Sequence, residues 1–126
     1  MNSLLVAGTR IVIIALLSYS IAIFTEQKKQ VVNNIVLIFI SLGIITDIIA
    51  TAFMISGSSN SPFTPHGILG YSSLLAMLID TILMWRHRIV NGKEAKVATG
   101  LHKYSRYAYL WWVLAFITGA ILVLFK

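Results

Sequence analysis

The chain has 126 residues, of which 58% are hydrophobic and only 11% are charged. Soluble globular proteins carry about 25% charged residues, so this composition excludes an ordinary water-soluble domain and predicts an integral membrane protein. The chain has no cysteine, which excludes disulfides, zinc–thiolate sites and cysteine-ligated iron–sulfur clusters. Its net charge of +6 comes mainly from residues at the ends of apolar segments, which is typical of membrane orientation and not of nucleic-acid binding.

Four apolar segments are each long enough to cross a bilayer, whose hydrocarbon core needs about 20 helical residues. The sequence predicts transmembrane helices at about residues 4–24, 34–55, 67–85 and 107–125. The connections are short, so consecutive helices should be antiparallel neighbours. Residues 1–126 should therefore form a single all-α domain, an antiparallel four-helix transmembrane bundle.

The three loops differ in charge, and this difference predicts the orientation. Residues 25–33 and 86–106 contain most of the lysines and arginines, whereas residues 56–65 contain no charged residue. Loops rich in lysine and arginine stay in the cytoplasm, so we expect the first and third loops inside and the second loop outside. The chain would then lie in the cytoplasmic membrane, with both termini on its outer side. The lipid bilayer would be its main partner.

Charged residues inside the predicted spans are candidates for function, because each costs about 2.5–3.5 kcal/mol on insertion scales. With a rise of about 1.5 Å per residue, Arg10 lies about 9 Å and Asp47 about 12 Å below the outer ends of their helices. These depths match. The sequence therefore predicts a structural ion pair between Arg10 and Asp47.

Asp80 lies about 8 Å from the inner end of the third predicted helix. Small and polar residues recur there at steps of three and four, which places Asp80 on the face that packs against other helices. A similar stripe on the fourth helix contains His102, Ser105, Tyr109, Trp112, Phe116 and Gly119. We predict that Asp80, His102 and Tyr109 form a buried cluster that acts as a proton relay or lines a cofactor pocket. The alternative is an isolated protonated aspartic acid bonded to a backbone carbonyl.

The three histidines are weaker candidates, as ligands of a haem b or a metal ion. His66 lies at the outer interface, about 21 Å along the helix from Asp80, so it cannot share one haem with His102. His87 and His102 are the pair at the cytoplasmic side. The simpler interpretation is that interfacial histidines hydrogen-bond to loop carbonyls or to lipid headgroups.

Four short motifs stand out: GIITD at residues 43–47, PHGILG at 65–70, HKYS at 102–105 and the pair Trp111–Trp112. Together they resemble the small HsmA-type hydrophobic proteins of bacteria and archaea. Proteins of that family are four-helix membrane proteins of about this length, so the resemblance implies the same fold over nearly the whole chain. The family places a histidine on the third helix where this chain has Asp80, and a bis-histidine haem site would then lack the partner of His102. The resemblance implies no particular reaction.

Three functions remain open. The first is a redox-associated membrane protein linked to a b-type haem or a quinone, because four-helix bundles often hold cofactors between their helices. The second is a non-catalytic accessory or assembly subunit of a larger membrane complex, which suits a small bundle with short loops. The third is a proton or ion pathway through a homo-oligomer. An enzyme with a Ser–His–Asp apparatus is the least expected, since Ser73, Asp80 and His66 share one helix face but span about 21 Å.

Overall fold

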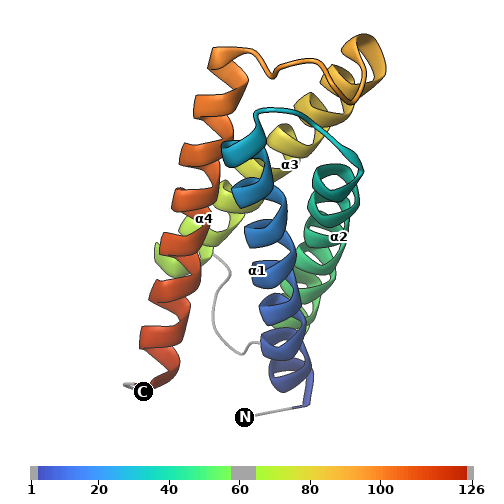
Figure 1. Ribbon diagram of the computed structural model, residues 1–126. Helices are drawn as coiled ribbons and strands as arrows, with labels where there is room; N and C mark the ends of the chain where they lie inside the picture. The colour runs from blue at the N-terminus through green and yellow to red at the C-terminus, as the bar shows by residue number, and fades with distance from the viewer. Residues whose placement is uncertain (1–2, 58–64, 125–126) are drawn as a thin grey trace.

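The computed structural model describes residues 3–57 and 65–124, and these residues form four α-helices. Figure 1 shows them as an antiparallel bundle, which confirms the predicted all-helical architecture. At a few helix ends the side chains lie outside the description: residues 4, 5, 57, 65, 66 and 122–124. The helices are α1 (Ser3–Lys29), α2 (Asn34–Gly57), α3 (Pro65–Asn91) and α4 (Thr99–Leu124).

Three of the helices extend further than predicted at the end of the bundle that carries the basic loops. The helix α1 continues beyond residue 24, α3 continues beyond residue 85, and α4 begins before residue 107. Hydropathy shows where an apolar segment ends, but the helix can continue as long as its backbone hydrogen bonds are made. The first and third loops therefore shrink to residues 30–33 and 92–98.

Local backbone chemistry sets these helix ends. Gln30 has a φ of 57° and its N–H donates to the carbonyl of Glu26 at 2.6 Å, so it ends α1 in the left-handed region. Gly92 ends α3 in the same way, with a φ of 91°. The side-chain oxygen of Asn33 accepts a hydrogen bond from the N–H of Val36 at 3.0 Å and caps the start of α2.

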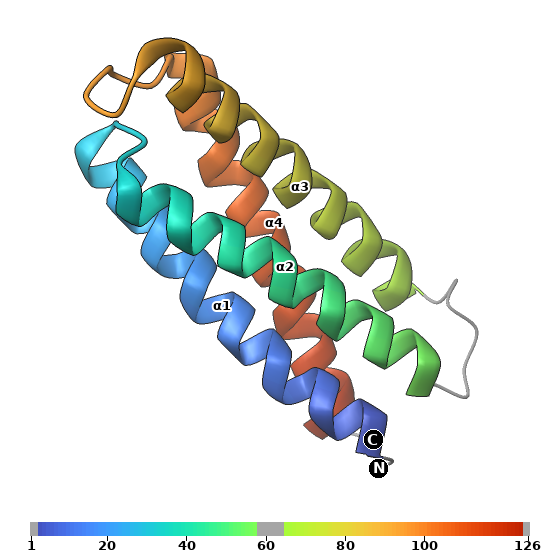
Figure 2. The same ribbon diagram turned by 90° about the vertical axis from the view of Figure 1, so that its right-hand side faces the viewer.

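The two short basic loops are joined to each other. The N–H of Val97 donates to the carbonyl of Gln30 at 2.7 Å, beside an isolated antiparallel bridge between Val31 and Lys96. Figure 2 shows the two loops together at one end of the bundle, as the antiparallel order of the helices requires. This contact holds the α1–α2 pair against the α3–α4 pair.

The closest helix packing is between α1 and α2, where two glycines allow the backbones to approach. A Cβ atom at Gly8 would lie 2.9 Å from Cγ of Met54, and one at Gly43 would overlap the ring of Tyr19. The helices α3 and α4 form the second close pair. The largest apolar side chains with less than 2% exposure are Tyr19, Ile23, Ile40, Met77, Met84, Val32 and Val36.

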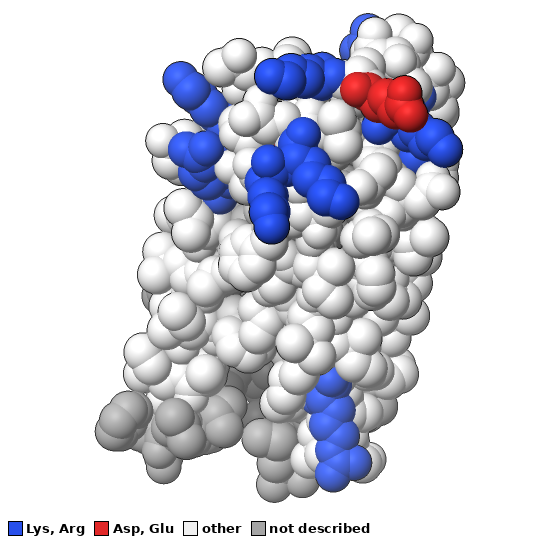
Figure 3. Space-filling model, in the orientation of Figure 1, with Lys and Arg blue, Asp and Glu red and all other residues white. Residues whose placement is uncertain are grey.

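The outer surface of the bundle is apolar along its length and basic at one end. Segments of α1, α2 and α3 are long and apolar enough to cross a membrane: Val6–Lys29, Asn34–Ser56 and Gly67–Asn91. In Figure 3 most of the blue side chains gather at the end with the two joined loops. The basic residues of these helix ends and loops are Lys28, Lys29, Arg86, Arg88, Lys93, Lys96, Lys103 and Arg106.

Candidate functional site

Three acidic side chains are buried inside the bundle, one each from α1, α2 and α3. Glu26 and Asp80 are 0% exposed and Asp47 is 4% exposed. Burying a carboxyl group is expensive unless it is protonated or hydrogen-bonded, so the partners of these three groups decide what they can do. Each of the three bonds to a residue of α4.

Those α4 residues are His102, Ser105 and Trp112, whose spacing places them on one face of the helix. This is the inward stripe that the sequence predicts for the fourth helix. The helix α4 therefore presents one polar face to acids from all three other helices.

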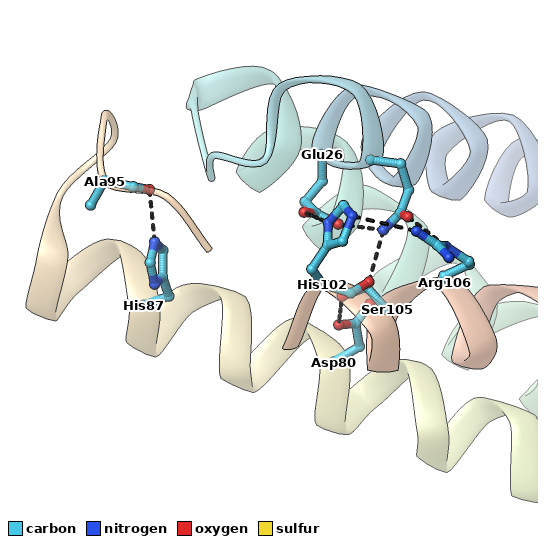
Figure 4. A network of polar contacts seen from close by, with 8 residues as sticks. Glu26, Asp80, His87, Ala95, His102, Ser105 and Arg106 are labelled. Carbon is cyan, nitrogen blue, oxygen red and sulfur yellow. Dashed lines mark hydrogen bonds and ion pairs between the residues drawn. The ribbon is translucent and has the colours of Figure 1, made fainter. Parts of the chain in front are cut away.

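Glu26 forms an ion pair with His102, whose Nδ1 atom lies 2.7 Å from Oε2 of the carboxylate. Gln27 supports the pair, because its side-chain amide donates to Oε1 of Glu26 at 2.7 Å and to the carbonyl of His102 at 2.9 Å. Arg106 donates to the side-chain oxygen of Gln27 at 2.8 Å and is itself exposed. Figure 4 shows this network, which runs from a buried carboxylate to the surface.

Asp80 accepts a hydrogen bond at Oδ1 from the hydroxyl of Ser105. Its second oxygen, Oδ2, is the one buried side-chain polar atom without a hydrogen-bond partner in the described part of the chain. An ionised carboxylate would leave this oxygen unsatisfied in an apolar interior, which is a costly state. Oδ2 is therefore a position where a proton can be held.

Asp47 lies among aromatic side chains and not beside Arg10. Its Oδ2 atom accepts hydrogen bonds from the hydroxyl of Tyr19 and from Nε1 of Trp112, each at 2.9 Å. The rings of Tyr19 and Trp112 also meet edge to face, with centroids 5.0 Å apart.

The predicted Arg10–Asp47 ion pair is therefore wrong: within the described residues no ion pair joins the two, and Arg10 is exposed. The face of α1 that packs on α2 includes Gly8, and Arg10 lies about 200° further around the helix, so it points outward. Equal depth in a membrane does not bring two side chains together when they face different directions.

The predicted cluster of Asp80, His102 and Tyr109 is not joined directly. Asp80 bonds to Ser105, His102 bonds to Glu26, and the hydroxyl of Tyr109 lies 2.6 Å from Oγ of Ser20 on α1. All three lie on helix faces that point into the bundle, but each has its own partner. The alternative prediction gives Asp80 a backbone carbonyl as its partner. The structure instead gives it the hydroxyl of Ser105.

The two histidine side chains that the structure describes, those of His87 and His102, do not converge on a ligand site. Nε2 of His87 lies 3.1 Å from the carbonyl of Ala95, and its Nδ1 lies 3.3 Å from the side chain of Asn91. Figure 4 shows His87 beside Ala95, apart from His102. The side chain of His66 lies outside the described residues, and no group of three metal-ligating residues occurs among those described.

The bond of His87 to a loop carbonyl agrees with the simpler interpretation, and its place at a membrane interface stays a prediction. The haem and quinone hypotheses stay predictions. The arrangement of His87 and His102 gives them no support, because each of these side chains bonds to a different partner.

Sequence reasoning missed Glu26 and did not assign partners to Ser105, Tyr19 and Trp112. Hydropathy assigns Glu26 to the first loop because it follows the apolar segment. The signal that identifies it is its register: Ala15, Tyr19, Ala22 and Glu26 follow one another at steps of four, three and four, and all four are buried.

Comparisons of the chain with protein-family models, with curated proteins and with solved structures find no match.

Proposed function

We propose that all four helices cross the cytoplasmic membrane, with the two joined loops in the cytoplasm and both termini outside. Three helices have suitable apolar segments, and residues 107–124 of α4 contain no charged side chain. The exposed surface carries many large apolar residues, which lipid would cover favourably. The basic residues at the loop end support the cytoplasmic assignment of that end.

We further propose that the protein moves protons, and that Asp80 is the group that takes up and releases them. The observation that carries this proposal is the fully buried carboxyl group with one oxygen bonded to Ser105 and the other without a partner. A carboxyl group in a membrane interior is costly to keep and is a functional candidate by default. Oδ1 is fixed by the serine, so Oδ2 is the atom that exchanges the proton.

The Glu26–His102 pair supplies the next acid–base groups on the way to the cytoplasmic surface. His102 lies one turn before Ser105 on α4, so it occupies the adjacent position on the same face. Both groups of the pair can bind and release protons, whereas the arginine beside them stays charged. Arg106 lies 3.5 Å from Nε2 of His102 and is exposed, which places the end of the network at the surface.

The function is tested by proton flux into proteoliposomes that contain a pH-sensitive dye. Asp80→Asn should abolish the flux that the wild-type protein supports. Asp47→Asn is the matched control, because asparagine can still accept the bonds from Tyr19 and Trp112, and its flux should stay near that of the wild type. Equal flux in the wild-type protein and Asp80→Asn would overturn the proposal.

A spectroscopic measurement identifies the site independently of transport. Infrared difference spectra across a pH titration should show a carboxyl band that disappears in Asp80→Asn. The same band should shift in His102→Ala, because that substitution removes the partner of Glu26 one helical turn before Ser105, the residue that bonds to Asp80. If the band is unchanged in His102→Ala, the Glu26–His102 pair is not part of the proton pathway.

A further inference from the structure

A groove between α2 and α3 lies at the basic end of the bundle, separate from the buried acids. Its volume is about 570 Å³. One part of its lining is apolar and another carries a guanidinium and an amide. The side chains that matter for its chemistry are Asn34, Leu37, Ile38, Trp85, Arg88 and Ile89.

Polarity changes along the length of this groove. Asn34 and Arg88 lie near the loop end of their helices, whereas Leu37, Ile38 and Trp85 lie about one turn further from the loops. Ile38 is 61% and Trp85 is 43% exposed, so the apolar part is open to the outside. The groove thus has a charged polar end, which Ile89 adjoins, and a mainly apolar floor that also includes the hydroxyl of Ser41.

The polar end is positively charged and held in place. Arg88 donates to the carbonyl of Val32 at 3.3 Å and to Oδ1 of Asn34 at 2.7 Å. A guanidinium has five N–H donors, so these two bonds leave others for a ligand. None of the described residues that line this groove is acidic.

The indole of Trp85 is also fixed, because its N–H donates to Oγ of Ser41 across the groove at 2.9 Å. A tryptophan beside a basic residue at one end of an apolar helix is typical of the level of lipid headgroups. The groove therefore presents its cation where a phosphate would lie and its apolar wall where an acyl chain would lie.

We propose that this groove binds an anionic phospholipid, with the phosphate at Arg88 and an acyl chain along Leu37, Ile38 and Trp85. The inference rests on the proposed membrane insertion and is independent of proton transport. Clusters of lysine and arginine attract anionic lipids to the cytoplasmic leaflet, and the loop end of this bundle is such a cluster. The groove gives that attraction a defined position.

Trp85 serves as a reporter of the bound lipid. The purified protein is placed in phosphatidylcholine vesicles that contain a small, equal fraction of either brominated phosphatidylglycerol or brominated phosphatidylcholine. Bromine quenches tryptophan on contact, and the Trp85→Phe variant identifies the part of the signal that comes from Trp85. We expect brominated phosphatidylglycerol to quench Trp85 about fivefold more effectively than its zwitterionic counterpart.

Two variants remove the positive charge from the groove in different ways. Arg88→Gln deletes it, and Asn34→Asp neutralises it while keeping an acceptor for the Arg88 hydrogen bond, so the second variant remains informative if the first fails to fold. Both should bring the quenching ratio close to one. Arg86→Gln is the matched control, because it changes the net charge equally from a residue outside the groove lining.

The outcomes separate this inference from the proposed membrane insertion. Strong quenching by both lipids with no preference overturns the lipid site alone, and an equal loss in Arg86→Gln attributes the preference to general charge. No quenching by either lipid would instead overturn insertion of this part of the bundle.

Discussion

His102 and Glu26 lie 2.7 Å apart, and their ion pair joins the start of α4 to the end of α1. The carboxylate is 0% exposed and the histidine side chain is 14% exposed. The two partners are therefore unequal. A substitution that leaves Glu26 alone strands a fully buried carboxyl group, whereas one that leaves His102 alone strands a side chain that solvent can partly reach.

The difference in burial between Glu26 and His102 gives a prediction for unfolding in detergent, which circular dichroism can monitor. His102→Ala should lower the free energy of unfolding by about 3–5 kcal/mol, the usual cost of stranding one buried partner. Glu26→Ala should cost less, and the double variant should cost less than the sum of the two. Additive single effects would show that the two residues do not stabilise the fold through each other.

Substitutions of Asp80 and Ser105 should affect the free energy of unfolding differently, because burying the Asp80 carboxyl group is itself destabilising. Ser105→Ala removes the donor to Oδ1 and should destabilise the protein by about 1–3 kcal/mol. Asp80→Leu removes both oxygens of the costly carboxyl group, and the Ser105 hydroxyl can then donate to a backbone carbonyl of its own helix, so stability should stay unchanged or rise. In the Asp80→Leu background, Ser105→Ala should have little further effect.

A matched serine on α3 serves as the control for that measurement. Ser73 is 1% exposed and its hydroxyl donates to the carbonyl of Gly70 within the same helix. Ser73→Ala breaks no contact with a carboxyl group, so its cost should be smaller than that of Ser105→Ala. Equal losses of stability in Ser73→Ala and Ser105→Ala would show that the Ser105–Asp80 bond stabilises the protein no more than a bond within one helix.

The sequence predicts the helices well because hydrophobic length is a strong signal, and it predicts the inward face of α4 because small and polar residues recur at helical spacing. His102, Ser105, Tyr109 and Trp112 all belong to that stripe, and all four bond to other helices. What a stripe on one helix cannot give is the partner, since the partner depends on how the other helices are rotated.

Glu26 and Arg10 show the two ways in which the sequence is insufficient. Glu26 follows the last apolar residues of its segment, so hydropathy assigns it to a loop, although the helix continues and turns it inward. Arg10 has the right depth for Asp47 but the wrong direction. Depth follows from counting residues, whereas direction follows from the face that packs, and here the close contact at Gly8 sets that face.

The contact between Gly43 and Tyr19 predicts that this glycine tolerates no side chain. A Cβ atom there would overlap the Tyr19 ring, which is fully buried and held by its bond to Asp47. Gly43→Ala should therefore destabilise the protein by about 1–3 kcal/mol through overpacking. Thermal unfolding in detergent measures the effect.

Gly70 is the matched control, because a Cβ atom there would meet nothing within 4 Å. Gly70→Ala should raise stability by up to about 1 kcal/mol, the difference in helix propensity between the two residues. If both substitutions destabilise equally, the glycines act through backbone flexibility and not through the close approach of α1 and α2.

The separate surroundings of Arg10 and Asp47 predict that their substitutions act independently. Arg10→Leu changes an exposed side chain and should alter stability by less than about 0.5 kcal/mol. Asp47→Leu leaves the donors of Tyr19 and Trp112 without their acceptor and should cost about 1–3 kcal/mol. The double variant should equal the sum of the two, and a double variant more stable than Asp47→Leu alone would restore the ion pair as the explanation.

The orientation of the bundle is the last prediction, and single cysteines test it because the natural chain has none. Ser59→Cys lies between α2 and α3, outside the described residues, and Lys93→Cys lies in the exposed loop before α4. The proposed topology places the first position outside the cell and the second in the cytoplasm, since positively charged loops are retained inside. In intact cells a membrane-impermeant thiol reagent should label Ser59→Cys and spare Lys93→Cys. Permeabilised cells provide the control, because both variants should then react. The reverse pattern in intact cells would place the basic end, and with it the Glu26–His102 pair, on the outer side of the membrane.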